Sequence, residues 1–165
     1  MINMSLVRAM KFAAMVVAGL SLAACSTNPN QMQGANAGLA GSAAPGSAQD
    51  FVVNVGDRVF FESDSSELTP QSVAILDKQA QWLQQYNRYA FTVEGHADER
   101  GTREYNIALG ARRAQAVRDY LTSRGVEGNR MRTISYGKER PVAVCNDLSC
   151  WSQNRRSVTV LNASS

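Results

Sequence analysis

Hydrophobic and polar residues alternate with two different periods after residue 50, and the period changes several times before the C-terminus. Short runs rich in β-branched and aromatic residues, typical of strands, occur at 51–55, 58–61, 89–95, 131–136 and 157–161. Thr69-Pro70 is a strong helix start, and apolar residues then recur at helical spacing to about Tyr86. A second helix follows the strand at 89–95 and is predicted to end near Ser123, before Gly125.

The element order β-α-β-α-β-β predicts an α+β sandwich, in which two helices pack on one face of a mixed sheet. Residues 51–165 are predicted to form this domain, because 165 residues suffice for one core and hardly for two. The apolar stripe of the first helix is Val73, Leu76, Ala80 and Leu83. Trp82 lies on a flank with Ile75 and Tyr86, where core packing is favoured over a partner contact.

The first 24 residues have the pattern of an export signal. Arg8 and Lys11 precede an uncharged apolar stretch at 12–24, which is shorter than the roughly 20 residues that span a bilayer. The stretch ends in Leu22-Ala23-Ala24-Cys25, which resembles a bacterial lipobox. The resemblance implies removal of residues 1–24 and acylation of Cys25, and several acyl chains anchor a protein stably. The alternative is an ordinary secretory signal in which Cys25 is incidental.

Residues 25–50 are predicted to be the lipidated cysteine and a flexible linker. The segment is rich in Gly, Ser, Asn and Ala and carries a single charge, Asp50, so it cannot build a core. In lipoproteins that this segment resembles, Asp after the cysteine retains the protein in the inner membrane. Ser26 therefore predicts the outer membrane, with the domain facing the periplasm.

The charge balance and the histidine count exclude several functions. Lys and Arg number 17 against 14 acidic residues, and removing Arg8 and Lys11 leaves 15 against 14, a mature charge of about +1. Nucleic-acid binding is not expected, because no basic face with interleaved aromatics exists. No metal or cofactor is predicted, since no zinc-ligand spacing occurs. His96 is the one histidine, and packing beside a turn is favoured over catalysis.

Cys145 and Cys150 bracket a short connection before the last strand. In an oxidising periplasm they are predicted to pair, with two unpaired thiols as the alternative. The spacing is not Cys-x-x-Cys, so a redox role is not expected.

Arg113 is the informative anomaly of the second helix. On the helical wheel it lies within the apolar arc, with Asn106 on the same stripe. A buried arginine needs a partner, because an unpaired buried charge is costly. Asp98, which ends the strand before this helix, is the nearest candidate. The pair is either a structural ion pair or the lining of a pocket for a ligand that carries both a carboxylate and an ammonium.

The run Gly95-His96-Ala97-Asp98-Glu99-Arg100-Gly101-Thr102 and the helix after it, through Arg113, resemble the OmpA-like peptidoglycan-binding domain. Ser135-Tyr136-Gly137 and Asn154-Arg155-Arg156 support the resemblance, which covers about residues 51–162. It implies a site for the diaminopimelate side chain of the stem peptide. It also implies the Tol proteins as partners in envelope integrity and cell division.

The resemblance assigns roles to six residues. Asp98 would accept from the diaminopimelate ammonium, and Arg113 would bind its carboxylate. Asp64 and Arg100 would lie at the rim, and Leu109 would form an apolar wall. Asn106 would help order the loop at the helix start. Many relatives carry a bulky apolar residue before the Asp64 position, where this chain has Ser63.

The residues and the resemblance leave two classes of function. The favoured one is a non-catalytic lipoprotein that tethers the outer membrane to peptidoglycan. The alternative is a wall-associated hydrolase or amidase. Glycan hydrolysis needs two carboxylates about 5–10 Å apart across a cleft. Asp98 and Glu99 are adjacent, and neighbours in a turn commonly point apart.

Overall fold

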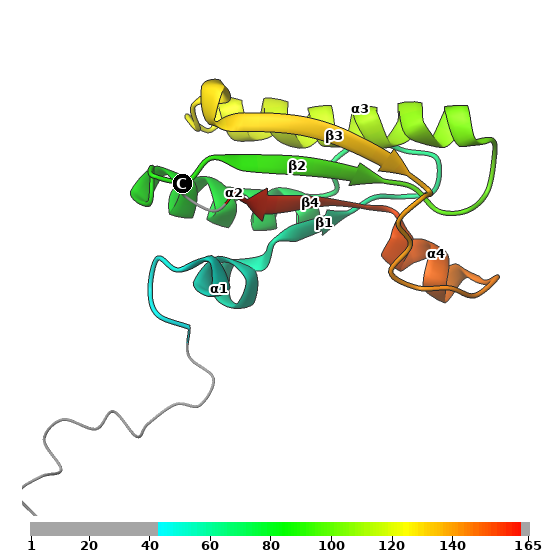
Figure 1. Ribbon diagram of the computed structural model, residues 1–165, viewed down its shortest axis with the longest axis horizontal. Helices are drawn as coiled ribbons and strands as arrows, with labels where there is room; N and C mark the ends of the chain where they lie inside the picture. Colours follow the sequence, from blue (N-terminus) through cyan, green and yellow to red (C-terminus); the bar gives the residue numbers. More distant parts are fainter. Residues whose placement is uncertain (1–42, 163–165) are drawn as a thin grey trace, which may run out of the picture. The chain divides into compact units, whose positions relative to one another are not determined.

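A four-stranded mixed sheet organises the described part of the chain (Figure 1). Its strands are β1 (Arg58–Phe60), β2 (Phe91–His96), β3 (Met131–Gly137) and β4 (Arg156–Leu161), in the order β1-β4-β2-β3. The last strand, β4, runs antiparallel to both of its neighbours, and β2 runs parallel to β3. The mixed sheet predicted from the sequence is confirmed.

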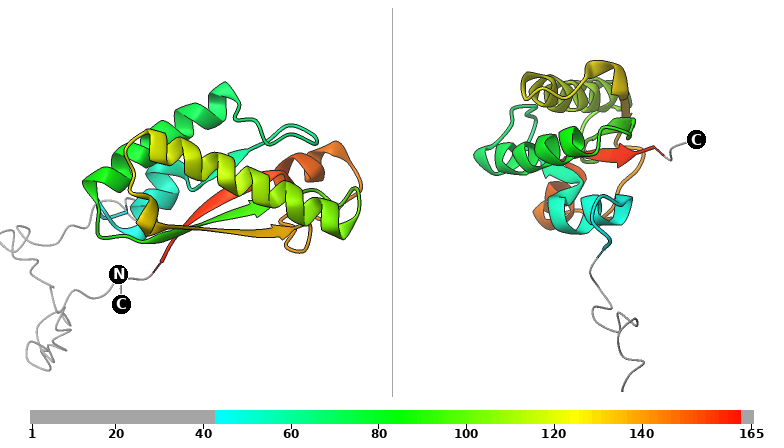
Figure 2. Two further views of the ribbon diagram at one scale, coloured as in Figure 1. Left: turned by 90° about the horizontal axis from the view of Figure 1, so that it is seen from above. Right: turned by 90° about the vertical axis from the view of Figure 1, so that its left-hand side faces the viewer.

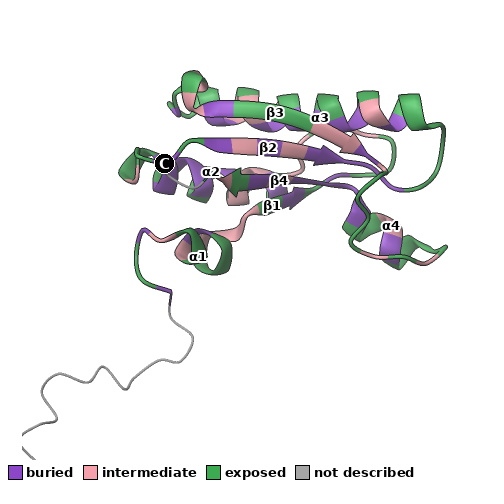
Figure 3. Cartoon of the chain, viewed as in Figure 1, coloured by how far each residue is buried: buried purple, intermediate pink, exposed green. Residues whose placement is uncertain are grey.

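Two long helices cover one face of this sheet, as predicted (Figure 2, left). Helix α2 (Pro70–Gln85) begins after Thr69, whose hydroxyl accepts from the Ser72 backbone N–H at 3.1 Å. Helix α3 (Arg103–Ser123) begins after Thr102 and ends before Gly125, which has a φ of 90°. The side chains between helices and sheet form the core, so buried residues line the inner faces of the helices (Figure 3). Trp82 is buried against Phe51, Tyr86 and Tyr89, so its predicted core role is confirmed.

The computed structural model describes residues 43–162. The predicted signal peptide 1–24, Cys25, Ser26 and linker residues 27–42 lie outside these residues. Within 43–162, no helix combines the length and the hydropathy that crossing a bilayer requires.

The predicted strand at 51–55 is wrong, because this segment is helical. Helix α1 (Ala48–Asp50) continues into a π-helix, η2 (Phe51–Gly56). The Asp50 carboxylate accepts from the Trp82 indole N–H at 2.9 Å, and the Phe51 ring packs on Trp82. A strand would have turned Val53 to the same side as Phe51, whereas Val53 is 58% exposed. Packing on α2 therefore overrides the β propensity of this run.

The packed part of the chain also begins before residue 51. The Gly46 carbonyl accepts hydrogen bonds from the Tyr89 hydroxyl at 2.8 Å and from Arg88 at 2.7 Å. Residues 43–50 therefore lie against the domain rather than in the predicted linker.

Helix α4 (Leu148–Asn154) was not predicted. Asp147 caps it by accepting from the backbone N–H groups of Ser149 and Cys150. Cys145 and Cys150 form a disulfide, with their Cα atoms 5.7 Å apart, so the predicted pairing is confirmed and the unpaired alternative is wrong. A 3-10 turn, η3 (Gly128–Arg130), precedes β3.

Replacing both cysteines with serine should lower the free energy of unfolding by about 2 kcal/mol, because the bridge restricts a short loop of the unfolded chain. Urea denaturation of the oxidised protein and the double variant measures the difference. Reductant should reproduce the loss in the wild-type protein and leave the variant unchanged. Equal stability of the two oxidised proteins would contradict the prediction.

Candidate functional site

A cavity of about 250 Å³ opens where the end of β2, the start of α3 and the loop after β1 meet. Five of the six residues predicted from the sequence line it, namely Asp64, Asp98, Arg100, Asn106 and Leu109. Ser63, Gly101 and Tyr105 complete the lining. Residues far apart in the sequence are therefore brought together as the resemblance implied. Arg113 is the exception.

The close approach of α3 to β2 sets the position of the cavity. Gly95 of β2 lies against Gly110 of α3, and a Cβ atom on either residue would overlap the backbone of the other. The missing side chains let the helix lie directly on the strand. As a result Asp98, three residues after Gly95, faces the helix turn that carries Asn106 and Leu109.

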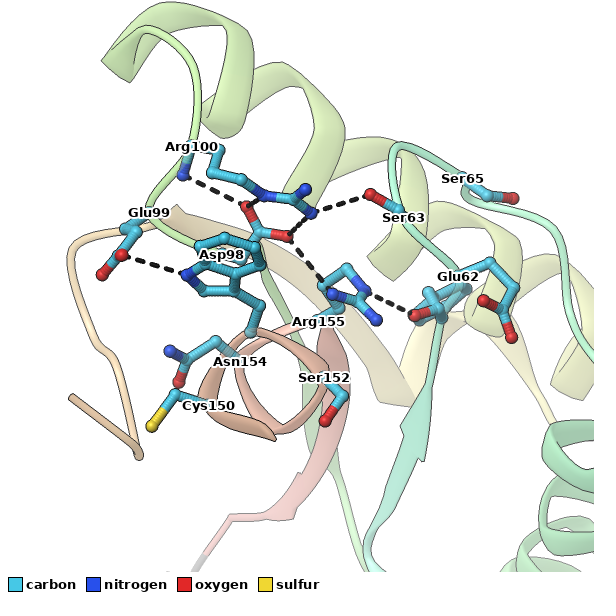
Figure 4. A network of polar contacts seen from close by, with 12 residues as sticks. Glu62, Ser63, Ser65, Asp98, Glu99, Arg100, Cys150, Ser152, Asn154 and Arg155 are labelled. Atoms are coloured by element: carbon cyan, nitrogen blue, oxygen red, sulfur yellow. Dashed lines mark hydrogen bonds and ion pairs between the residues drawn. The ribbon is translucent and has the colours of Figure 1, made fainter. Parts of the chain in front are cut away.

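Asp98 is buried, and two arginines hold its carboxylate (Figure 4). Arg100 donates to it from Nη2 at 2.7 Å and from Nε at 3.1 Å, and Arg155 donates from Nη1 at 3.5 Å. Burial alone would raise the pKa of Asp98, but the hydrogen bonds and charge of Arg100, together with Arg155, hold it below its ordinary value. Asp98 is therefore an ionised carboxylate at neutral pH.

Arg113 points inward as predicted, but its hydrogen-bond partners are not carboxylates. The side chain is fully buried and donates to the carbonyl oxygens of Glu62 at 3.1 Å, Ser65 at 2.8 Å and His96 at 2.8 Å. The structural Asp98–Arg113 ion pair, one of the two alternatives drawn from the sequence, is thus wrong, because each nitrogen of the guanidinium donates to a backbone carbonyl. Burial lowers the pKa of Arg113 to about 10, with the charge of Asp98 opposing the shift. The arginine remains protonated and lies outside the cavity lining.

Hydrogen bonds order the rim of the cavity. The Asn106 side chain donates to the Arg100 carbonyl at 2.7 Å, which fixes the loop at the helix start as expected. Arg100 also donates to the Ser63 hydroxyl at 2.7 Å. The Tyr105 hydroxyl donates to Asp64, which has a φ of 57°. Asp64 is thereby held at the cavity in a left-handed backbone conformation.

Sequence reasoning missed three residues around the cavity. Tyr105 of α3 is 44% exposed, and its hydroxyl donates to Asp64. Arg155 lies in the Asn154-Arg155-Arg156 run, but the sequence pattern does not predict its contact with Asp98. Trp151 of α4 lies under the Arg100 guanidinium at 4.3 Å from the ring centroid, and its indole N–H donates to Glu99 at 3.0 Å. Asp147, a good N-cap before Leu148, is the signal that could have revealed α4.

His96 packs at the strand end, as favoured from the sequence. It is 2% exposed, its ring lies 5.6 Å from that of Tyr136, and neither ring nitrogen has a hydrogen-bond partner among residues 43–162. Glu94 is 3.6 Å from Nε2. Burial, followed by the charges of Arg156 and Arg140, lowers the pKa of His96 to about 4. The imidazole is therefore neutral and structural.

The stability of the fold should fall as the pH drops from about 6.5 to about 4. The unfolded histidine titrates near pH 6.5, whereas folded His96 titrates at about 4, so only the unfolded chain binds this proton between these values. His96→Gln should flatten this part of the profile relative to the wild type. Urea denaturation across the range measures both proteins, and identical slopes would contradict the assignment.

A comparison with protein families decides what this architecture is. The model of the OmpA family matches residues 60–155. The chain belongs to the OmpA family. A protein of Rhizobium meliloti (strain 1021) named peptidoglycan-associated lipoprotein is 66% identical over 149 residues, which are 88% of this chain and 84% of the relative. A protein of the same name from Pseudomonas aeruginosa is 42% identical over 161 residues, 88% of this chain and 93% of the relative.

Solved structures agree with this OmpA family assignment. The crystal structure of the peptidoglycan-associated lipoprotein from Burkholderia pseudomallei matches with a TM-score of 0.66 and 38% identity, over 70% of this chain and 100% of that one. The C-terminal domain of Helicobacter pylori MotB matches with a TM-score of 0.61 and 25% identity, over 65% of this chain and 84% of that one. The resemblance stated from the motif and the α+β architecture are both confirmed.

Proposed function

We propose that this OmpA family member is a lipid-anchored outer-membrane protein whose folded domain binds peptidoglycan without cleaving it. The observation that carries the proposal is the cavity with an ionised Asp98 beside the partly exposed arginine Arg100. The names of the relatives from Rhizobium meliloti and Pseudomonas aeruginosa support the same polymer as ligand. A protein held at a membrane by lipid and at the wall by its domain tethers the two layers.

The ligand group is the diaminopimelate side chain of the stem peptide. It ends in an ammonium and a carboxylate on one carbon, so it requires an anion and a cation side by side. In our proposal Asp98 accepts from the ammonium, and Arg100 turns from Asp98 to the carboxylate. Leu109 supplies the apolar wall, and Asp64 lies at the rim. Arg113 adds positive charge from beneath and fixes the loop that carries Asp64.

The anchor and the partners extend this proposal beyond the domain. Cys25 would carry the acyl chains, and the segment that follows would span the gap between membrane and wall. Ser26 supports the outer membrane. Association with the Tol proteins during cell division rests on the resemblance to the family.

The arrangement of the carboxylates at the site favours binding over the alternative of a hydrolase or amidase. A glycosidase acid needs a raised pKa so that it can donate a proton near neutral pH. The pKa of Asp98 is lowered, and Glu99 accepts from the Trp151 indole. Asp64 accepts from Tyr105. Each carboxylate at the site is thus arranged as an acceptor, which favours binding over acid catalysis.

Asp98→Asn should lower binding to purified sacculi at least about tenfold, because the amide cannot neutralise an ammonium. Co-sedimentation measures the binding, and Asp119→Asn on the exposed face of α3 is the matched control. The wild type should sediment with sacculi and release no soluble fragments. Release of fragments by the wild type, or full binding by Asp98→Asn, would overturn the proposal.

Arg113→Lys should lower the free energy of unfolding by about 2–4 kcal/mol, since one ammonium cannot reach three carbonyls and leaves buried acceptors without donors. The neighbouring exposed Arg112→Lys should change it by less than about 0.5 kcal/mol. Urea denaturation measures both. A fully stable Arg113→Lys variant that no longer binds sacculi would instead assign Arg113 a direct contact with the ligand.

A further inference from the structure

Trp151 of helix α4 contacts the loop after β2, although it does not line the cavity beside Asp98. Its ring lies under the Arg100 guanidinium, with 4.3 Å between the guanidinium carbon and the ring centroid. Its indole N–H donates to the Glu99 carboxylate at 3.0 Å. Figure 4 shows Glu99 and Arg100 next to this helix. One side chain of α4 therefore holds two consecutive residues of the loop that carries the ligand site.

Arg100 is the exposed partner of its ion pair with Asp98. The Arg100 side chain is 42% exposed, whereas that of Asp98 is 8% exposed. In the proposed binding mode a ligand ammonium takes the Asp98 carboxylate, so the bonds from Arg100 to Asp98 break. The Ser63 hydroxyl and the Trp151 ring remain as contacts of the guanidinium. A long exposed side chain loses conformational freedom when it binds a ligand, and this cost weakens binding unless the side chain is held beforehand.

An aromatic ring can hold a guanidinium without fixing its hydrogen bonds. The positive charge is attracted to the negative face of the ring, and the N–H donors stay free for acceptors in the plane of the guanidinium. Arg100 can therefore turn from Asp98 to a ligand carboxylate while it stays on Trp151. Among the aromatic side chains, the indole of tryptophan gives the strongest attraction of this kind.

Helix α4 is short, but contacts on both sides of Trp151 fix it. The disulfide joins Cys150 to Cys145 in the preceding loop. The Asn154 carboxamide donates to the Ala143 carbonyl at 2.7 Å and accepts from the Ala143 backbone N–H at 3.2 Å. The helix is thus joined to the loop before it at one residue before Trp151 and at one residue after it. The ring is therefore in place before any ligand arrives.

We infer that Trp151 is a positioning residue that makes the site selective for a side chain with a carboxylate beside its ammonium. It acts through Arg100: the ring holds the guanidinium at the cavity while Asp98 exchanges its arginine for the ligand ammonium. The freed donors of Arg100 then turn to the ligand carboxylate. This inference rests on the proposed function, because it requires Asp98 and Arg100 to bind the two charges of diaminopimelate. A ligand lysine, which has the ammonium without this carboxylate, gains nothing from Trp151.

Calorimetry with the purified full-length chain in detergent compares two stem peptides, one with diaminopimelate and one with lysine at the same position. The wild type should bind the diaminopimelate peptide at least about tenfold more tightly. Trp151→Leu should lower the affinity for this peptide about three- to tenfold, because a cation–π contact is lost, and leave the affinity for the lysine peptide unchanged. Trp151→Phe keeps a ring under Arg100 and should retain most of the preference.

Further variants distinguish an effect through Arg100 from an effect on the fold. Trp151 lies outside the core between helices and sheet, and Trp151→Gln, which suits a partly exposed helical position, should reproduce the loss seen in Trp151→Leu. In an Arg100→Ala background, Trp151→Leu should cause no further loss. Leu148→Ala, at a position of the same helix that is 69% exposed, should change neither affinity. Urea denaturation measures the stability of each variant.

The outcomes separate this inference from the proposed function. Unchanged affinities, or equal loss of both peptides, in Trp151→Leu and Trp151→Gln overturn the positioning role. Additive loss in the Arg100→Ala background also overturns it, because Trp151 then acts without Arg100. Equal wild-type affinity for the two peptides overturns the contact of Arg100 with the carboxylate, and this inference with it. Asp98→Asn should lose both peptides. If it keeps the diaminopimelate peptide, the proposed peptide site fails whatever Trp151 contributes.

Discussion

The rest of the site depends on one buried guanidinium. Arg113 donates to three carbonyl oxygens, two in the loop after β1 and one at the end of β2. Helix α3 thereby holds two segments that form no strand pair with each other. The same loop supplies Ser63 and Asp64 to the lining of the cavity beside Asp98. A charge buried in this way is tolerated because each nitrogen of the guanidinium has a hydrogen-bond acceptor. Moving the loop away would leave these donors buried without acceptors, and this free-energy cost keeps the loop in one conformation.

The short helix α4 gives the site its second support. Asp147 and the disulfide fix its start, and its far end leads directly to Arg155 on Asp98. Trp151, in the middle of the helix, packs under Arg100. Helix α4 therefore positions both arginines that donate to the Asp98 carboxylate. A change at the disulfide would reach the cavity through these two contacts.

The fold could be predicted from the sequence wherever the pattern and the packing agree. Thr69-Pro70 and the repeat of Leu76, Ala80 and Leu83 defined α2, and the helical wheel turned Arg113 inward correctly. The partners of Arg113 could not be predicted, because a loop carbonyl leaves no mark in a side-chain pattern. The helical conformation of residues 51–55 could not be predicted, because packing on Trp82, distant in sequence, decides it. Most of the residues that line the cavity beside Asp98 could be predicted, because they belong to one contiguous motif. The contacts of Arg155 and Trp151 could not, because they depend on the unpredicted helix α4.

If Asp98 binds the ligand ammonium as we propose, its pairing with Arg100 has a consequence for the strength of peptidoglycan binding. A ligand ammonium that reaches Asp98 must displace an arginine two residues away in the same loop, and such a tethered competitor has a high effective concentration. Each attachment is thus an exchange of one ion pair for another and yields only a modest net affinity. Under the proposed function, firm adhesion between membrane and wall would then come from the avidity of many copies along the membrane. Individual contacts would dissociate and re-form while the wall is remodelled.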